Sequence, residues 1–265
     1  MTASAGRIWA IALNTFREAA RVRVLYGLVV LVLGANLMSA VLGEMSVHEE
    51  TRVAQDMGVA ATSLFGSLTA IFLGVFLLYT EVQRRTIHAI VSKPIERWEF
   101  VVGKYLGMAM VPSALVGMFA LATVVTLLWR GAPVTVAIVQ ALLLAWLEVL
   151  TVAAIAIFFS SFSSPFLSGI FALAMWVIGR LTPDIEAATR TASASIRWTA
   201  QIALEIVPDL HLFAVSGSQV DGVNVSVHDQ FVSWSYMGLA AAHAAGWIAG
   251  LLAFACLLFR RRDFV

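Results

Sequence analysis

Residues 131–179 read GAPVTVAIVQALLLAWLEVLTVAAIAIFFSSFSSPFLSGIFALAMWVIG and contain a single charge, Glu148. This run is more than twice the roughly 20 apolar residues that cross a bilayer as one helix. Its serine-rich centre, residues 160–164, offers side chains that compete for backbone hydrogen bonds, and Pro165 suits the first turn of a new helix. The run therefore predicts two membrane spans, residues 134–159 and 165–181, joined by a very short turn.

Four more spans are predicted at residues 24–43, 57–80, 101–129 and 236–259, each around an apolar run that lies between charges; in the third, this run begins after Lys104. Charged residues make up only 12% of the chain and hydrophobic residues 60%, whereas soluble domains carry about 25% charged residues. The runs are continuous and rich in Leu, Ala, Val and Gly, which favours helices over the alternating pattern of a membrane barrel. We expect residues 1–265 to form one all-α polytopic membrane domain with six transmembrane helices.

The distribution of basic residues predicts the orientation of these spans. Six spans place both termini on one side of the membrane, and that side holds twelve of the 17 Lys and Arg residues. The remaining five are Arg52, Arg130, Arg180, Arg190 and Arg197. Because basic loops stay on the cytoplasmic side, both termini are expected to be cytoplasmic.

The leader, residues 6–23, is too polar to span a membrane. At helical spacing, its polar residues, including Arg7, Arg17 and Arg21, fall on one arc, while apolar residues fall on the other. This pattern is typical of an interfacial helix on the cytoplasmic leaflet, with Trp9 at the level of the lipid headgroups. The alternative is a flexible basic leader.

The segment between the last two spans, residues 182–230, is expected to lie outside the cytoplasm. Pro183 and Pro208 bracket one weakly amphipathic helix, and spaced valines then suggest a short extended piece. The segment is either a packed lid or a gate or docking surface for an extracytoplasmic partner. Its histidines and aspartates, His211, His228, Asp209, Asp221 and Asp229, match no metal-ligand spacing, so no metal site is predicted.

The loop at residues 81–100 is the most informative part of the chain. From Glu81 to Lys104, eight charges alternate with apolar residues. This mixture is typical of a segment with one face on the membrane domain and the other on a cytosolic partner. Pro94 interrupts any continuous helix and predicts two short helices. An ordinary positive-inside loop would explain the basic residues but not the ordered mixture.

The motifs of this loop resemble those of a known family. They are Glu81, Arg84-Arg85-Thr86, Ser92-Lys93-Pro94-Ile95, Arg97-Trp98-Glu99-Phe100 and Gly103-Lys104-Tyr105-Leu106-Gly107. Together they look like the hallmark stretch of type-two ABC exporter permeases. The resemblance is closest to the branch of nitrous oxide reductase maturation and gliding-motility permeases.

The resemblance implies a permease of the bacterial inner membrane with an elbow helix at 6–23 and a coupling loop at 81–100. That loop would contact a cytosolic ABC ATPase subunit, present in two copies, and a second permease chain would complete the pathway. Mapped onto this sequence, the coupling residues are Glu81, Arg84, Arg85, Thr86, Lys93, Pro94, Arg97 and Lys104. The elbow residues at the membrane interface are Arg7, Trp9, Arg17 and Arg21.

No Walker A pattern, G-x-x-x-x-G-K-[ST], occurs in the chain. We therefore expect the partner subunit to bind ATP and Mg. This chain is expected to bind no cofactor and no nucleic acid and to contain no catalytic residue. Three polar residues within the spans, Glu148, Asn36 and His243, are candidates for a function in the membrane. A structural hydrogen bond between helices is the favoured role of Glu148.

Three functions are compatible with these features. The chain could be the permease subunit of an ATP-driven exporter. It could instead be a membrane anchor that transmits ATP-driven motion to an extracytoplasmic partner without moving a solute. The third is an intramembrane enzyme that uses Glu148 or His243.

Overall fold

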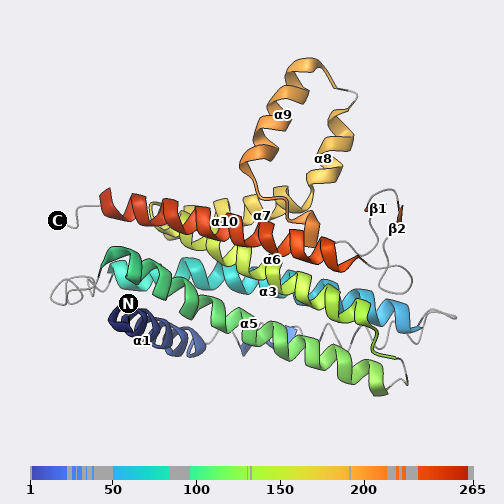
Figure 1. Ribbon diagram of the computed structural model, residues 1–265, viewed down its shortest axis with the longest axis horizontal. Helices are drawn as coiled ribbons and strands as arrows, with labels where there is room; N and C mark the ends of the chain where they lie inside the picture. The colour runs from blue at the N-terminus through green and yellow to red at the C-terminus, as the bar shows by residue number, and fades with distance from the viewer. Residues whose placement is uncertain are drawn as a thin grey trace.

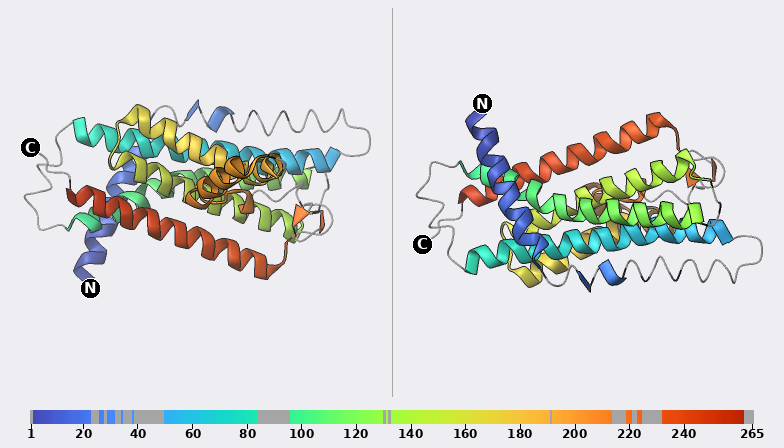
Figure 2. Two further views of the ribbon diagram at one scale, coloured as in Figure 1. Left: turned by 90° about the horizontal axis from the view of Figure 1, so that it is seen from above. Right: turned by 90° about the horizontal axis from the view of Figure 1, so that it is seen from below.

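The computed structural model describes residues 2–22, 26–27, 29–31, 34, 38, 50–83, 96–129, 131, 133–190, 192–213, 219–220, 223–224 and 232–261. Among the described residues, the long helices run roughly along one axis and form a bundle (Figure 1). A helix near the N-terminus lies obliquely across one end of this bundle (Figure 2), and a pair of short helices projects from its side. The prediction of an all-α fold is therefore confirmed for the described part of the chain.

The bundle consists of α3 (Glu50–Gln83), α5 (Arg97–Trp129), α6 (Val136–Ser160), α7 (Pro165–Arg180) and α10 (Trp234–Arg261). Within the described ranges, four helices are long and apolar enough to cross a membrane, or five if α7 is counted with the helix after it as one bent span. Most of the expected first span, residues 24–43, lies outside the described residues.

The local sequence explains where these helices begin and end. α6 ends at a turn formed by Ser161–Ser164, and Pro165 occupies the first turn of α7, a position where a missing N–H has no cost. Pro112 lies inside α5, which nevertheless continues as one helix from Arg97 to Trp129. α5 thus begins within the predicted coupling loop.

The core of the bundle lies where α3 meets α6 and α5. A Cβ atom at Gly74 of α3 would lie 2.5 Å from the Cβ of Ala156, and one at Gly66 would lie 2.7 Å from a methyl group of Val149. Small residues therefore let the helices approach closely, as is common in membrane bundles. The Ser160 hydroxyl donates to the carbonyl of Gly74 at 3.1 Å.

The segment after α7 contains two helices, not one. α8 (Thr182–Thr189) and α9 (Ala194–Ile206) are separated at Arg190–Ser193, so the expected single helix over residues 182–207 is wrong. Ser193 has an extended ψ of 155° immediately before α9, and such residues favour the start of a new helix. A 3-10 turn, η1 (His211–Phe213), follows, and β1 (Gln219–Val220) pairs with β2 (Val223–Asn224).

Candidate functional site

The first candidate site lies where α1 (Thr2–Ala20) crosses the start of α5. The guanidinium of Arg7 donates two hydrogen bonds to the carboxylate of Glu99, at 2.9 and 2.6 Å. The backbone N–H of Glu96 donates to the same carboxylate at 3.3 Å. The leader helix is thus fixed to the last residues of the predicted coupling loop, 81–100.

Gly103 and Gly107 of α5 form the surface against which α1 packs, which we call the glycine seat or α1 seat. A Cβ atom at Gly107 would lie 2.2 Å from the carbonyl oxygen of Ala12 and 2.7 Å from the Cβ of Thr15. One at Gly103 would lie 2.9 Å from the Cβ of Ile11. The Gly-x-x-x-Gly pattern therefore lets α1 pack directly against the backbone of α5.

This seat decides which face of α1 is buried. Ala12, Thr15 and Ala19 are buried, whereas Arg17 and Arg21 are exposed. Trp9 is 58% exposed, as an aromatic anchor in lipid headgroups would be. The small residues of the leader therefore face the protein, and Trp9 and the basic residues remain available to the surroundings.

Substitution of Gly107 tests this seat. Gly107→Ala should lower the free energy of unfolding by about 1–3 kcal/mol, since the methyl group meets a backbone oxygen that cannot move aside. Gly117→Ala on the same helix is the matched control, because a Cβ atom at Gly117 would have no packing neighbour within 4 Å among the described residues. Thermal unfolding of the detergent-purified variants measures both, and equal stabilities would contradict the close packing.

The second candidate site surrounds Glu148, whose side chain is fully buried. Its carboxylate accepts hydrogen bonds from three donors: the Ser63 hydroxyl at 2.5 Å, the Trp176 indole N–H at 3.0 Å and the Arg180 guanidinium at 2.8 Å. Arg180 also donates to the Ser63 hydroxyl at 2.6 Å. Side chains from α3, α6 and α7 therefore meet in one polar cluster, which we call the Glu148 cluster.

The Glu148 cluster neutralises its charges internally. The Arg180 side chain remains 29% exposed, and its guanidinium carbon lies 5.9 Å from the centre of the Trp176 ring. A buried charge needs such a partner and further hydrogen bonds, because burial of an unpaired ion is costly. The arrangement suits a cross-link between helices better than a free acid or base.

Sequence reasoning identifies Glu148 as a candidate but not its partners. Ser63 and Trp176 lie within apolar runs and carry no charge that would mark them. The distribution of basic residues predicts that Arg180 lies on the outer side of the membrane. The available signal is the length of α7, because 16 residues extend only about 24 Å. That length is shorter than the hydrocarbon core of about 30 Å, so a charge at the end of α7 can reach the membrane interior.

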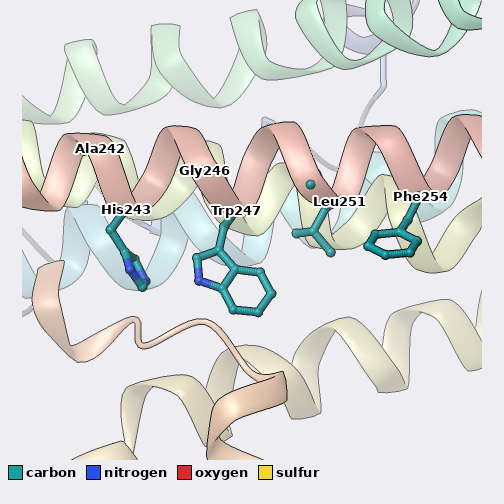
Figure 3. Close-up of a pocket in the computed structure, with 7 residues that line it drawn as sticks. Ala242, His243, Gly246, Trp247, Leu251 and Phe254 are labelled. Atoms are coloured by element: carbon teal, nitrogen blue, oxygen red, sulfur yellow. The ribbon is translucent and has the colours of Figure 1, made fainter.

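The remaining candidate residues lie apart from this cluster. His243 and Trp247 project from one side of α10 into a shallow apolar groove, together with Leu251 and Phe254 (Figure 3). Within the described residues, Nε2 of His243 is buried without a hydrogen-bond partner. Its ring centre lies 6.4 Å from those of Phe213 and Trp247.

The structure describes the predicted coupling residues only in part. Lys104 is buried, and its ammonium lies 5.8 Å from the centre of the Phe100 ring. Glu81 belongs to the last turns of α3 and Arg97 begins α5. Arg84, Arg85, Thr86, Lys93 and Pro94 lie outside the described residues, as does Asn36.

A metal centre finds no support in the part of the chain that the structure describes, where no group of three or more His, Cys, Asp or Glu side chains could hold an ion. His228, Asp221 and Asp229 fall outside that part. The backbone N–H of His211 instead donates a local hydrogen bond to the Asp209 carboxylate at 3.1 Å.

Comparison with known proteins places the whole chain in one family. No curated protein matches it. The sequence profile described as "ABC-2 family transporter protein" matches residues 9–264, which include the α1 seat, the predicted coupling loop and every helix of the bundle. Members of this family are membrane subunits that work with a separate ATPase and lack a nucleotide-binding domain of their own. The chain is therefore a multi-pass membrane protein that belongs to the ABC-2 transporter family.

Proposed function

We propose that this chain is the permease subunit of an ATP-driven exporter, with six spans and both termini in the cytoplasm of a bacterium. The observation that carries the proposal is the family match over residues 9–264. To what membership of the family establishes, the proposal adds the coupling to ATP hydrolysis, the export direction, the six spans, the cytoplasmic termini and the location in the inner membrane.

On the cytoplasmic side, residues 81–100 are proposed to receive the ATPase subunit. They run from the last residues of α3 to the first residues of α5, so a displacement of the loop acts on both helices. The Arg7–Glu99 ion pair and the glycine seat join α1 to the same end of α5. We infer that α1 is the elbow helix and moves with α5 when the loop is displaced, while Trp9, Arg17 and Arg21 hold it at the lipid surface.

Membership of the family supports a separate ATPase as a partner of this chain. Two copies of a cytosolic ABC ATPase would bind and hydrolyse ATP with Mg, and a second permease chain would complete the pathway. Within the membrane, the Glu148 cluster is proposed to hold α3, α6 and α7 together. Asn36 and His243 remain candidates for contacts with a substrate or another span.

One observation supports an alternative of a different class. α8 and α9 project from the bundle and expose apolar side chains (Figure 1), so they could pass motion to an extracytoplasmic protein without transport of a solute. The third function, an intramembrane enzyme, is disfavoured because the Glu148 carboxylate already accepts three hydrogen bonds.

Purification of the tagged chain from its native membrane in mild detergent tests the proposal. We expect a nucleotide-binding subunit to accompany the chain in equal amount, and the preparation to hydrolyse ATP. A chain that purifies without such a subunit and without ATPase activity would overturn the proposal. An additional stoichiometric extracytoplasmic protein would favour the anchor over the exporter.

A further inference from the structure

The depth at which α7 ends sets the position of α8 and α9. Glu148 lies twelve residues from each end of α6, Val136–Ser160, or about 18 Å at the helical rise of 1.5 Å. The ion pair with Glu148 holds Arg180, the last residue of α7, close to this level. The chain therefore leaves the bundle near the middle of the membrane-spanning helices.

The chain also returns to the bundle at this level. The N–H of Leu210 donates to the carbonyl of Gly179 at 3.0 Å, and a Cβ at Gly179 would lie 2.4 Å from the carbonyl oxygen of Pro208. Both ends of the segment 181–207 thus contact the end of α7. We call this segment, with α8 and α9, the arm.

The arm extends sideways rather than outward. The axis of α8 is bent by 65° from that of α7, and Figure 1 shows α8 and α9 standing away from the long axis of the bundle. A helix of eight residues, about 12 Å long, rises only about 5 Å at this angle. α8 therefore remains within the depth spanned by α6.

The surface of the arm is unsuited to lipid chains. No residue of α8 or α9, both of which are fully described, is buried. The exposed side chains include five charges: Asp184, Glu186, Arg190, Arg197 and Glu205. Charged residues at membrane depth face protein or a water-filled cavity, because contact with hydrocarbon is costly.

The same arm carries an apolar ridge. Trp198, Ile202 and Ile206 follow one another at four-residue spacing on α9 and are 66%, 37% and 65% exposed. Side chains at this spacing lie on one face of a helix. A surface with an apolar ridge and charges of both signs can complement itself, which a symmetric contact between two identical chains requires.

We propose that the arm packs against a second copy of this chain and forms part of the contact between the two permease subunits. This inference rests on the proposed function, since it requires the bundle to span the membrane as a paired permease. The depth of the arm disfavours a soluble extracytoplasmic partner, and its charges disfavour lipid. Ridge residues would pack on the second copy while the charged residues pair across the contact or line water between the subunits.

A photo-reactive residue at position 198 tests the inference. Trp198→p-benzoylphenylalanine replaces one exposed aromatic side chain by another, so the fold should be retained. Irradiation in native membranes should give a covalent product of about twice the 28.6 kDa of one chain, and two differently tagged copies should be found together in it. The matched control is the same substitution at Phe166 of α7, which is 79% exposed near the start of that helix and should give no such product.

The other outcomes separate the arm from the proposed function. Adducts with lipid alone, or with a different protein, at position 198 would overturn the inference even if the ATPase subunit co-purifies. Dimeric product at position 198 from a chain that brings no ATPase would leave the contact standing and remove the exporter assignment. Equal dimer yields at positions 198 and 166 would also overturn the inference.

Discussion

Glu148→Ala is expected to lower the free energy of unfolding by about 3–5 kcal/mol, the range found when one partner of a buried ion pair is removed. The substitution leaves the Arg180 guanidinium without its carboxylate and deprives Ser63 and Trp176 of their acceptor. Titration of the purified chain with denaturing detergent measures the change. Glu205→Ala, an exposed carboxylate on α9, is the control and should change stability by no more than about 0.5 kcal/mol.

A double variant separates the charge from the shape of the cluster. Glu148→Gln and Arg180→Gln remove both charges, and replacement of a buried pair by neutral groups is often nearly neutral for stability. We expect the double variant to be more stable than either single variant, which a double-mutant cycle reports as a coupling energy. A Glu148→Ala variant as stable as Glu205→Ala would contradict a structural role for the cluster.

The helices of the bundle are predictable because their signals are local. The serine run and Pro165 mark the turn between α6 and α7, and gaps between charges mark the long apolar helices. The break between α8 and α9 escapes prediction because periodic apolar residues continue across it, and only Ser193 marks the start of the second helix.

The candidate sites are less predictable because they depend on how distant segments meet. The pairing of Arg7 with Glu99 joins residues 92 positions apart, and nothing in either neighbourhood specifies the other. The partner of Glu148 depends on the depth at which α7 ends, which becomes apparent only when α6 and α7 lie side by side. The Gly103–Gly107 spacing indicates close packing, but the sequence does not identify α1 as the helix that fills it.

The second large effect is expected at the coupling loop, where Arg84, Arg85 and Arg97 would be changed together to Glu. If these residues face the ATPase subunit, reversal of three charges places like charges against one another, which costs several kcal/mol. Because each 1.4 kcal/mol corresponds to a factor of ten, the affinity for the ATPase subunit should fall about 100-fold or more.

The matched control makes the same change at the other end of the molecule. Arg52→Glu and Arg130→Glu also reverse basic residues, and the distribution of basic residues predicts both on the outer side of the membrane, away from the loop and outside the arm. We expect this variant to retain the ATPase subunit. A similar loss in both variants would indicate a general effect of charge on the membrane protein rather than a contact at the loop.

The most direct test of the central claim, that residues 81–100 couple this permease to a separate ATPase, is the rate of ATP hydrolysis in membranes that contain the native chain, the loop variant or the control variant with Arg52→Glu and Arg130→Glu. We predict that only the loop variant loses the hydrolysis that depends on the permease, while its amount in the membrane stays unchanged. Full hydrolysis and full association of the ATPase subunit with the loop variant would contradict the claim.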